Sequence, residues 1–172
     1  GGGCELMAKR WNVTREEQDQ FAVESHQKAA KAWDEGFYDD LVMELGGINR
    51  DNIVRGDSTM EKMAKLKPAF DKKGGTLTAA NSTPLTDGSS MVFLGTEKAQ
   101  KFYNRDPMAE LCDYEVTAVD VKRDGLLMAP ASAMLKLLMR NKMKFDDVDI
   151  FELHEAFAAQ TLCCLKAWNN DK

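Results

Sequence analysis

Residues 151–160 read FELHEAFAAQ, and this stretch points to the fold more clearly than any other part of the chain. An apolar run ends at Leu153, His154 and Glu155 follow at once, and an alanine-rich run around Phe157 then favours a helix. In α/β proteins, polar residues between the end of a strand and the start of a helix often bind ligands. His154 is therefore a candidate functional residue, although on position alone a capping or structural histidine is the more common interpretation.

Helical patterns occupy the first part of the chain and return towards its end. Thr14 to Glu17 form the sequence of a capping box, which predicts a helix over residues 14–33. The residues expected on its buried side, at helical spacing, are Phe21, Ala22, Ala29 and Trp33. Further helices are predicted over residues 5–11, 58–65, 97–103, 131–141 and 156–168.

Four short segments are rich in apolar or β-branched residues and are predicted to be strands: residues 75–81, 90–94, 114–121 and 148–153. Helices thus come first, and strands mixed with helices follow. This order predicts an α/β protein with a helical insertion.

Composition excludes several classes of protein. The 172 residues carry a formal net charge of -5, which disfavours general nucleic-acid binding. No apolar run approaches the roughly 20 residues of a membrane-spanning helix. The four cysteines (Cys4, Cys112, Cys163 and Cys164) form no CxxC pair, so the sequence predicts neither a metal site nor a disulfide framework.

A locally basic stretch stands out in this acidic chain. Seven cations lie between residues 50 and 73: Arg50, Arg55, Lys62, Lys65, Lys67, Lys72 and Lys73. Such a run is either a solvated face or a patch that binds an anionic ligand, such as a phosphorylated cofactor.

Four segments together resemble the thiolase family. Residues 75–88, GTLTAANSTPLTDG, resemble the family's GTVTAxNxSxLxDG segment, and MAKLKPAFD at 63–71 matches the stretch before it. Residues 14–29 are similar to the SREEQD…SHxxA helix, and 151–160 to the NEAF/HEAF segment. The segments occur in the family's order and span almost the whole chain. The HEAF form is most similar to fatty-acid thiolases of the trifunctional type.

The resemblance implies a thiolase-like α/β fold fragment, made of a helical loop domain and part of the βαβαβ catalytic halves. Residues 1–84 would form the CoA-binding loop domain. Residues 85–104 would be a returning strand and helix of the N-terminal catalytic domain, and 105–172 the first part of the C-terminal one. The implied reaction is thiolytic cleavage of a 3-ketoacyl-CoA, with coenzyme A as a substrate and no permanently bound cofactor.

The resemblance also implies roles for individual residues. His154 would help to form an oxyanion hole, which stabilises negative oxygen in the reaction. Arg55 would contact the nucleotide end of CoA, although a solvated loop arginine is the alternative. The remaining implied contacts with CoA or substrate are Phe70, Ala79, Thr83, Leu126, Ala156 and Phe157. Lys62 stands where some members of the family have a CoA-contacting serine.

Several family motifs are missing from the sequence. The nucleophilic cysteine of thiolases precedes the region matched here, while the GHP and CxGGG motifs follow it. No cysteine of this chain stands in either cysteine motif, so each is expected to be an ordinary buried or surface thiol. We therefore expect an internal fragment that is inactive alone. A non-catalytic CoA-binding or subunit-interaction module, and a plain α/β domain, are the alternatives.

Partners and location follow from the resemblance alone. It implies acyl-CoA and CoA as ligands, a homo-oligomer, and association with a hydratase/dehydrogenase subunit in the trifunctional type. The mitochondrial matrix is the favoured compartment, with another β-oxidation organelle or the bacterial cytoplasm as alternatives.

Overall fold

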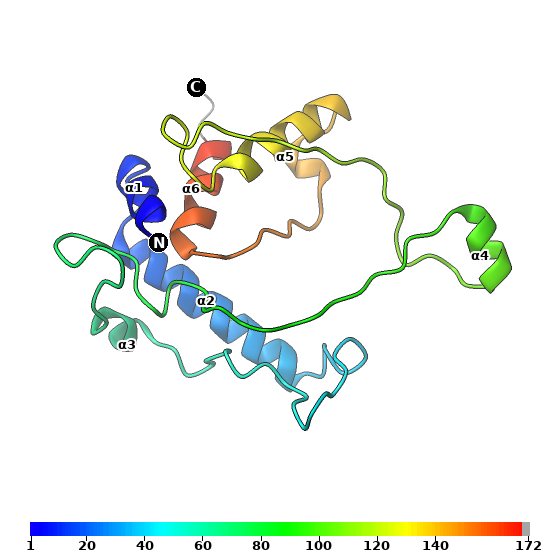
Figure 1. The fold of residues 1–172 in the computed structure, drawn as a ribbon, viewed down its shortest axis with the longest axis horizontal. Helices are drawn as coiled ribbons and strands as arrows, with labels where there is room; N and C mark the ends of the chain where they lie inside the picture. Colours follow the sequence, from blue (N-terminus) through cyan, green and yellow to red (C-terminus); the bar gives the residue numbers. More distant parts are fainter. Residues whose placement is uncertain (170–172) are drawn as a thin grey trace.

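The structure is a computed structural model that describes residues 1–169. The long helix α2 runs through its body with α3 and α6 against it, and α4 lies far from it at the end of an arm (Figure 1). The elements are α1 (Gly2–Arg10), α2 (Arg15–Asp34), α3 (Met60–Ala64), α4 (Glu97–Tyr103), α5 (Ala129–Arg140), the 3-10 helix η1 (Phe145–Asp147) and α6 (Ala158–Asn169). All six α-helices were predicted from the sequence, with ends that differ by three residues at most.

Helix α2 begins with the predicted capping box. The Thr14 hydroxyl accepts the backbone N–H of Glu17 at 3.1 Å, and the Glu17 carboxylate accepts that of Thr14 at 2.6 Å. Two N–H groups that would otherwise lack a helical partner are thereby satisfied. Along the predicted buried side, Ala22 is fully buried, while Phe21, Ala29 and Trp33 are half-buried.

The main core lies where α1, α5 and α6 meet. Cys4 and Met7 of α1 pack with Cys163 and Cys164 of α6, and Leu77 joins them from the loop that follows α3. The two helices are neighbours although they lie at opposite ends of the sequence (Figure 1). A smaller cluster joins α2 to α3 through Ala22, Val23 and Met63.

The four predicted strands do not pair into a sheet among residues 1–169. Only two isolated bridges occur in this part of the chain, between Leu45 and Ile48 and between Ser82 and Phe157. A strand is held by a ladder of hydrogen bonds from a neighbouring strand. Among residues 1–169, segment 75–81 makes single backbone bonds, from Ala69 to Leu77 and from Ala158 to Asn81, but none of the four segments has such a ladder. The prediction that these four segments form strands was therefore wrong for this chain on its own.

One long arm leaves the body of the molecule. Residues 85–119 run out and back as open chain around α4, which has no buried residue (Figure 1). Large apolar side chains along the arm are almost fully in solvent, including Phe93 at 93% and Met108 at 99% exposure. Among residues 1–169, no helix has the length and apolar character needed to cross a bilayer.

Candidate active-site groove

A short antiparallel contact joins the two segments that carry the strongest sequence signals. The Thr83 N–H donates to the Ala156 carbonyl at 2.9 Å, and the Ala158 N–H donates to the Asn81 carbonyl at 3.0 Å. Ser82 and Phe157 face each other between these bonds. The segment at 75–88 and the segment at 151–160 therefore meet, and His154 lies just before the point of contact.

A groove of about 830 Å³ lies beside this contact, and we call it the central groove. It is lined by four predicted site residues, Arg55, Ala79, Thr83 and His154, together with one side of α2. This volume is within the usual range for small-molecule sites. A second hollow, of about 1140 Å³, shares His154 with the central groove but contains none of the other predicted site residues.

The other predicted contacts lie outside the central groove. The rings of Phe70 and Phe157 pack edge to face, with centroids 5.9 Å apart. Leu126 lies against the start of α1, where a Cβ on Gly3 would come within 3.2 Å of the leucine side chain. Ala156 contributes the carbonyl that accepts from Thr83. The structure thus gathers four of the eight predicted residues around one space and places the other four outside it.

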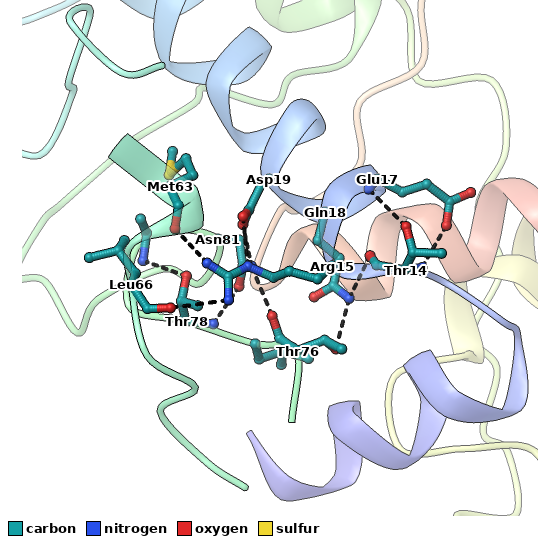
Figure 2. A network of polar contacts seen from close by, with 12 residues as sticks. Thr14, Arg15, Glu17, Gln18, Asp19, Met63, Leu66, Thr76, Thr78 and Asn81 are labelled. Atoms are coloured by element: carbon teal, nitrogen blue, oxygen red, sulfur yellow. Dashed lines mark hydrogen bonds and ion pairs between the residues drawn. The ribbon is translucent and has the colours of Figure 1, made fainter. Parts of the chain in front are cut away.

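A buried polar network holds the wall of the groove against α2 (Figure 2). The Asn81 amide donates to the Asp19 carboxylate at 2.9 Å and to the Thr76 carbonyl at 3.2 Å, and its oxygen accepts the Thr78 N–H at 2.8 Å. Asp19 in turn accepts from the Arg15 guanidinium at 2.6 Å. Because a buried polar group without a partner is costly, this network favours one conformation of residues 76–81.

Arg15 also fixes the opposite wall. Its guanidinium donates to the carbonyls of Met63 at 2.5 Å and Leu66 at 3.2 Å, at the end of α3 (Figure 2). A cation at this position satisfies helix-end carbonyls and is favoured by the helix dipole. Both walls of the groove are therefore tied to the first turns of α2.

His154 is exposed and lines the groove, and the residue after it is anchored to α2. The Ser25 hydroxyl donates to the Glu155 carboxylate at 2.6 Å, a charge-assisted hydrogen bond. The His154 ring makes no hydrogen bond to another of residues 1–169, which leaves both ring nitrogens available to a ligand.

Arg55 brings a positive charge to the groove. Its guanidinium donates to the carbonyls of Asn52 at 2.6 Å and Val54 at 3.3 Å, and it has no carboxylate partner within residues 1–169. Lys62 also lines the groove, but it is paired with Asp57 at 2.5 Å. Arg55 therefore offers an anionic ligand a cation that is not held in an ion pair within residues 1–169, although Asp51 and Asp57 also line the groove.

His26 lines the groove but is not among the predicted site residues, because a histidine midway along a largely polar helix resembles a surface residue. It is half-buried, and its Nδ1 accepts the backbone N–H of Arg55 at 3.3 Å. Burial, together with the nearby Arg55 charge, lowers the pKa of His26. Helical spacing contained the necessary signal, because His26 is four residues after the buried Ala22 and so shares its face of α2.

None of the four cysteines lines the groove. Cys4, Cys163 and Cys164 are buried in the core, and Cys112 is exposed on the arm. Burial raises the pKa of Cys4 and of Cys163 to about 12, so both remain protonated at neutral pH and are poor nucleophiles. Within residues 1–169, no group of histidine, cysteine or acidic side chains is arranged to hold a metal ion.

Known proteins match this chain along its whole length. The family model for the thiolase N-terminal domain matches residues 1–98, and the model for the thiolase C-terminal domain matches residues 105–172. A 3-ketoacyl-CoA thiolase of Pectobacterium carotovorum is 43% identical over 178 residues, covering 100% of this chain and 40% of that protein. A 3-ketoacyl-CoA thiolase of an Enterobacter species is 44% identical over 178 residues, covering 100% of this chain and 41% of that protein.

Two solved structures share the fold. The acetyl-CoA acetyltransferase of Bacillus anthracis superposes with a TM-score of 0.86 at 36% identity, over 98% of this chain and 44% of that one. The acetyl-CoA acetyltransferase of Syntrophomonas wolfei superposes with a TM-score of 0.83 at 34% identity. The match covers 98% of this chain and 43% of that one. The predicted thiolase-like α/β fold is thus confirmed, and the chain spans about 40% of the length of the curated relatives it matches. Because a family model covers more than half of its residues, this chain belongs to the thiolase family.

Proposed function

We propose that this chain is a segment of a 3-ketoacyl-CoA thiolase, an acyltransferase of fatty-acid β-oxidation, and that it forms the CoA-binding wall of the active site. The observation that carries the proposal is the central groove, where Arg55, Ala79, Thr83 and His154 meet although they are far apart in sequence. Relatives named 3-ketoacyl-CoA thiolase, 43 and 44% identical to this chain, support it.

The lining of the groove suits an elongated thioester with a phosphorylated end. Arg55 would bind the nucleotide phosphates, because a guanidinium pairs well with phosphate oxygens. Ala79 and Thr83 would flank the pantetheine arm, which would run towards His154. Phe70, Leu126, Ala156 and Phe157 would contact the ligand beyond the groove itself. CoA would act as a substrate, with no resident cofactor.

The proposed reaction breaks the carbon–carbon bond between C2 and C3 of a 3-ketoacyl-CoA. The acyl part passes to the sulfur of free CoA, and the remaining two-carbon unit takes up a proton to become acetyl-CoA. A ring N–H of His154 would stabilise the negative oxygen that develops on the thioester. The attacking thiol would come from polypeptide other than this chain, because none of its cysteines lies at the groove.

The proposal is tested by titrating the chain with CoA in a calorimeter. We expect binding that Arg55→Ala weakens about tenfold, since a charged hydrogen bond contributes roughly 1.5–3 kcal/mol. The matched control is Arg50→Ala, because Arg50 pairs with Asp34 at 2.8 Å and does not line the groove. Equal losses in the two variants, or no binding at all, would contradict the proposal.

A non-catalytic CoA-binding or subunit-interaction module is the second candidate, and the position of the cysteines away from the groove favours it. A thiolysis assay of the intact gene product separates the two candidates, because only the enzyme turns over. The chain by itself should show no turnover in either case, and turnover by the chain alone would contradict the assignment of the thiol to other polypeptide.

The setting of the activity is part of the same proposal. We propose acyl-CoA and CoA as ligands and a homo-oligomeric enzyme, with a hydratase/dehydrogenase subunit as partner in the trifunctional type. The mitochondrial matrix is the proposed compartment, with the cytoplasm as its counterpart if the source is bacterial, as the similar proteins from Pectobacterium and Enterobacter are.

A further inference from the structure

Three consecutive residues of α2 contact the two segments that carry the proposed ligand-binding groups. Ser25 bonds to the residue that follows His154, His26 bonds to Arg55, and Gln27 bonds to the end of the Arg55 turn. We propose that Ser25, His26 and Gln27 act as positioning residues that set the separation between His154 and Arg55. This inference rests on the proposed function, because it assigns those two residues to opposite ends of one ligand.

The contact at Ser25 acts on the reacting end of the ligand. Its hydroxyl donates to Glu155 at 2.6 Å, and Glu155 directly follows His154 in the chain. The other anchor of this segment is the pair of backbone bonds at residues 156 and 158. Without the Ser25 bond, the nearest residue after His154 that is hydrogen-bonded within residues 1–169 is Ala156, so the position of the imidazole becomes less well defined.

The contacts at His26 and Gln27 act on the phosphate end. His26 Nδ1 accepts the Arg55 N–H at 3.3 Å, and the Gln27 amide donates to the Ser58 carbonyl at 3.0 Å. The Ser58 N–H donates back to the Arg55 carbonyl at 3.0 Å and closes the turn. The two neighbouring side chains of α2 therefore hold both ends of the turn that carries the Arg55 guanidinium.

Helix α2 is well suited to fix a distance of this kind. Its first turn is held by the capping box and by the Arg15 bonds to α3 and Asp19. A helix has a fixed rise of about 1.5 Å per residue, so side chains on adjacent residues keep a constant separation. The charged groups that act on the pKa of His26 are Arg55, which lowers it, and Glu155 and Asp51, which raise it, and all three line the central groove.

The test uses steady-state thiolysis by the intact gene product, because the two contacts should affect different constants. His26→Ala should raise the KM for CoA about tenfold at nearly constant kcat, since binding remote from the reacting atoms is lost. Ser25→Ala should lower kcat about tenfold with little change in KM, because a small displacement of an oxyanion donor is costly.

Conservative variants distinguish positioning from simple structural support. His26→Asn places an acceptor oxygen near the position of Nδ1, and Ser25→Thr keeps the hydroxyl, so each should recover most of the loss. Gln20→Ala is the control on the same helix, because Gln20 is exposed and bonds only to Glu24. The inference is overturned if each alanine variant changes kcat and the KM for CoA together. It is also overturned if the conservative variants do not recover the loss.

A ligand-free measurement separates this inference from the proposed function. Amide hydrogen exchange at Arg55 should be about tenfold faster in His26→Ala than in the unaltered protein, because the N–H loses its acceptor. If the protein neither binds CoA nor catalyses thiolysis, the proposed function is wrong, and the exchange rates still decide whether His26 anchors Arg55. Equal exchange rates overturn the inference, whatever the activity.

Discussion

A single buried amide, that of Asn81, ties the wall of the central groove to helix α2. Asn81 is 2% exposed, and its side chain makes three hydrogen bonds, to Asp19, Thr76 and Thr78. Its backbone carbonyl also accepts the N–H of Ala158, in the segment that contains His154. The residue therefore contributes both to stability and to the shape of the site.

We expect Asn81→Ala to lower the free energy of unfolding by about 2–3 kcal/mol, because it leaves the Thr78 N–H and an Asp19 oxygen buried without a partner. Urea unfolding followed by circular dichroism measures the difference. Asn49→Ala is the control, since Asn49 is exposed in a loop, and its effect should stay within about 0.5 kcal/mol. A loss of under about 1 kcal/mol at Asn81 would mean that the network is not important for stability.

Sequence patterns predicted some, but not all, of the residues that line the central groove. The order of motifs led to His154, Arg55, Ala79 and Thr83, and these four do line one groove. Pattern alone could not separate them from Phe70 or Leu126, which the fold places near the start of α1. His26 was overlooked because a histidine on a mostly polar helix resembles a solvated residue until the Arg55 loop is seen to cover it.

Among the helices, α2 depends on an ionised residue at its beginning. The Thr14 backbone N–H is the main cause that lowers the pKa of Glu17, and a hydrogen bond from Lys166 adds to it. The Lys166 ammonium lies 3.0 Å from the carboxylate, so Glu17 also links α2 to α6. A folded-state pKa below the unfolded value means that the charged form favours folding.

We expect the stability advantage of the unaltered chain over Glu17→Gln to depend on pH. The advantage should be fully present above the unfolded-state pKa of about 4.5 and should be lost as the pH falls through the lowered folded-state pKa. It should amount to under about 1 kcal/mol, because the side chain is 40% exposed and screened by solvent. Thermal unfolding of both proteins between pH 3 and 7 is the measurement, and a difference that grows towards low pH would contradict this account.

Helices were easier to predict than strands for a physical reason. The hydrogen bonds of a helix lie within one segment, so the local sequence predicted α4 at residues 97–103, where the structure has it. A strand needs a partner from elsewhere in the chain. Residues 90–94 have the composition of a strand, yet among residues 1–169 they lie in solvent without one. The local sequence could indicate that these residues favour extended backbone, but not which segment would pair with them.

For the chain as a whole, the arm at residues 85–119 exposes a continuous set of apolar side chains. Met91 is 79% and Phe93 is 93% exposed, and their neighbours Val92 and Leu94 are similar. Exposed apolar chain with free backbone groups is a common cause of self-association.

We expect sedimentation velocity of the chain to show association that increases with concentration. Met91→Glu combined with Phe93→Glu should reduce it, because charges make the apolar contact unfavourable. Lys98→Glu is a charge-matched control, since both variants lower the net charge by two, and it should leave the association nearly unchanged. Only monomers at all concentrations, or an equal effect of the control, would show that the arm is not the cause.

The packing of α1 against α6 has a consequence for synthesis on the ribosome. Helix α1 is made before α6, and the surface it covers, with Cys163 and Cys164, follows about 150 residues later. At about 5–20 residues per second, the nascent helix waits on the order of ten seconds for this surface. A nine-residue helix is marginal on its own, so a translation stall before residue 158 leaves the emerging chain without its main core and dependent on chaperones.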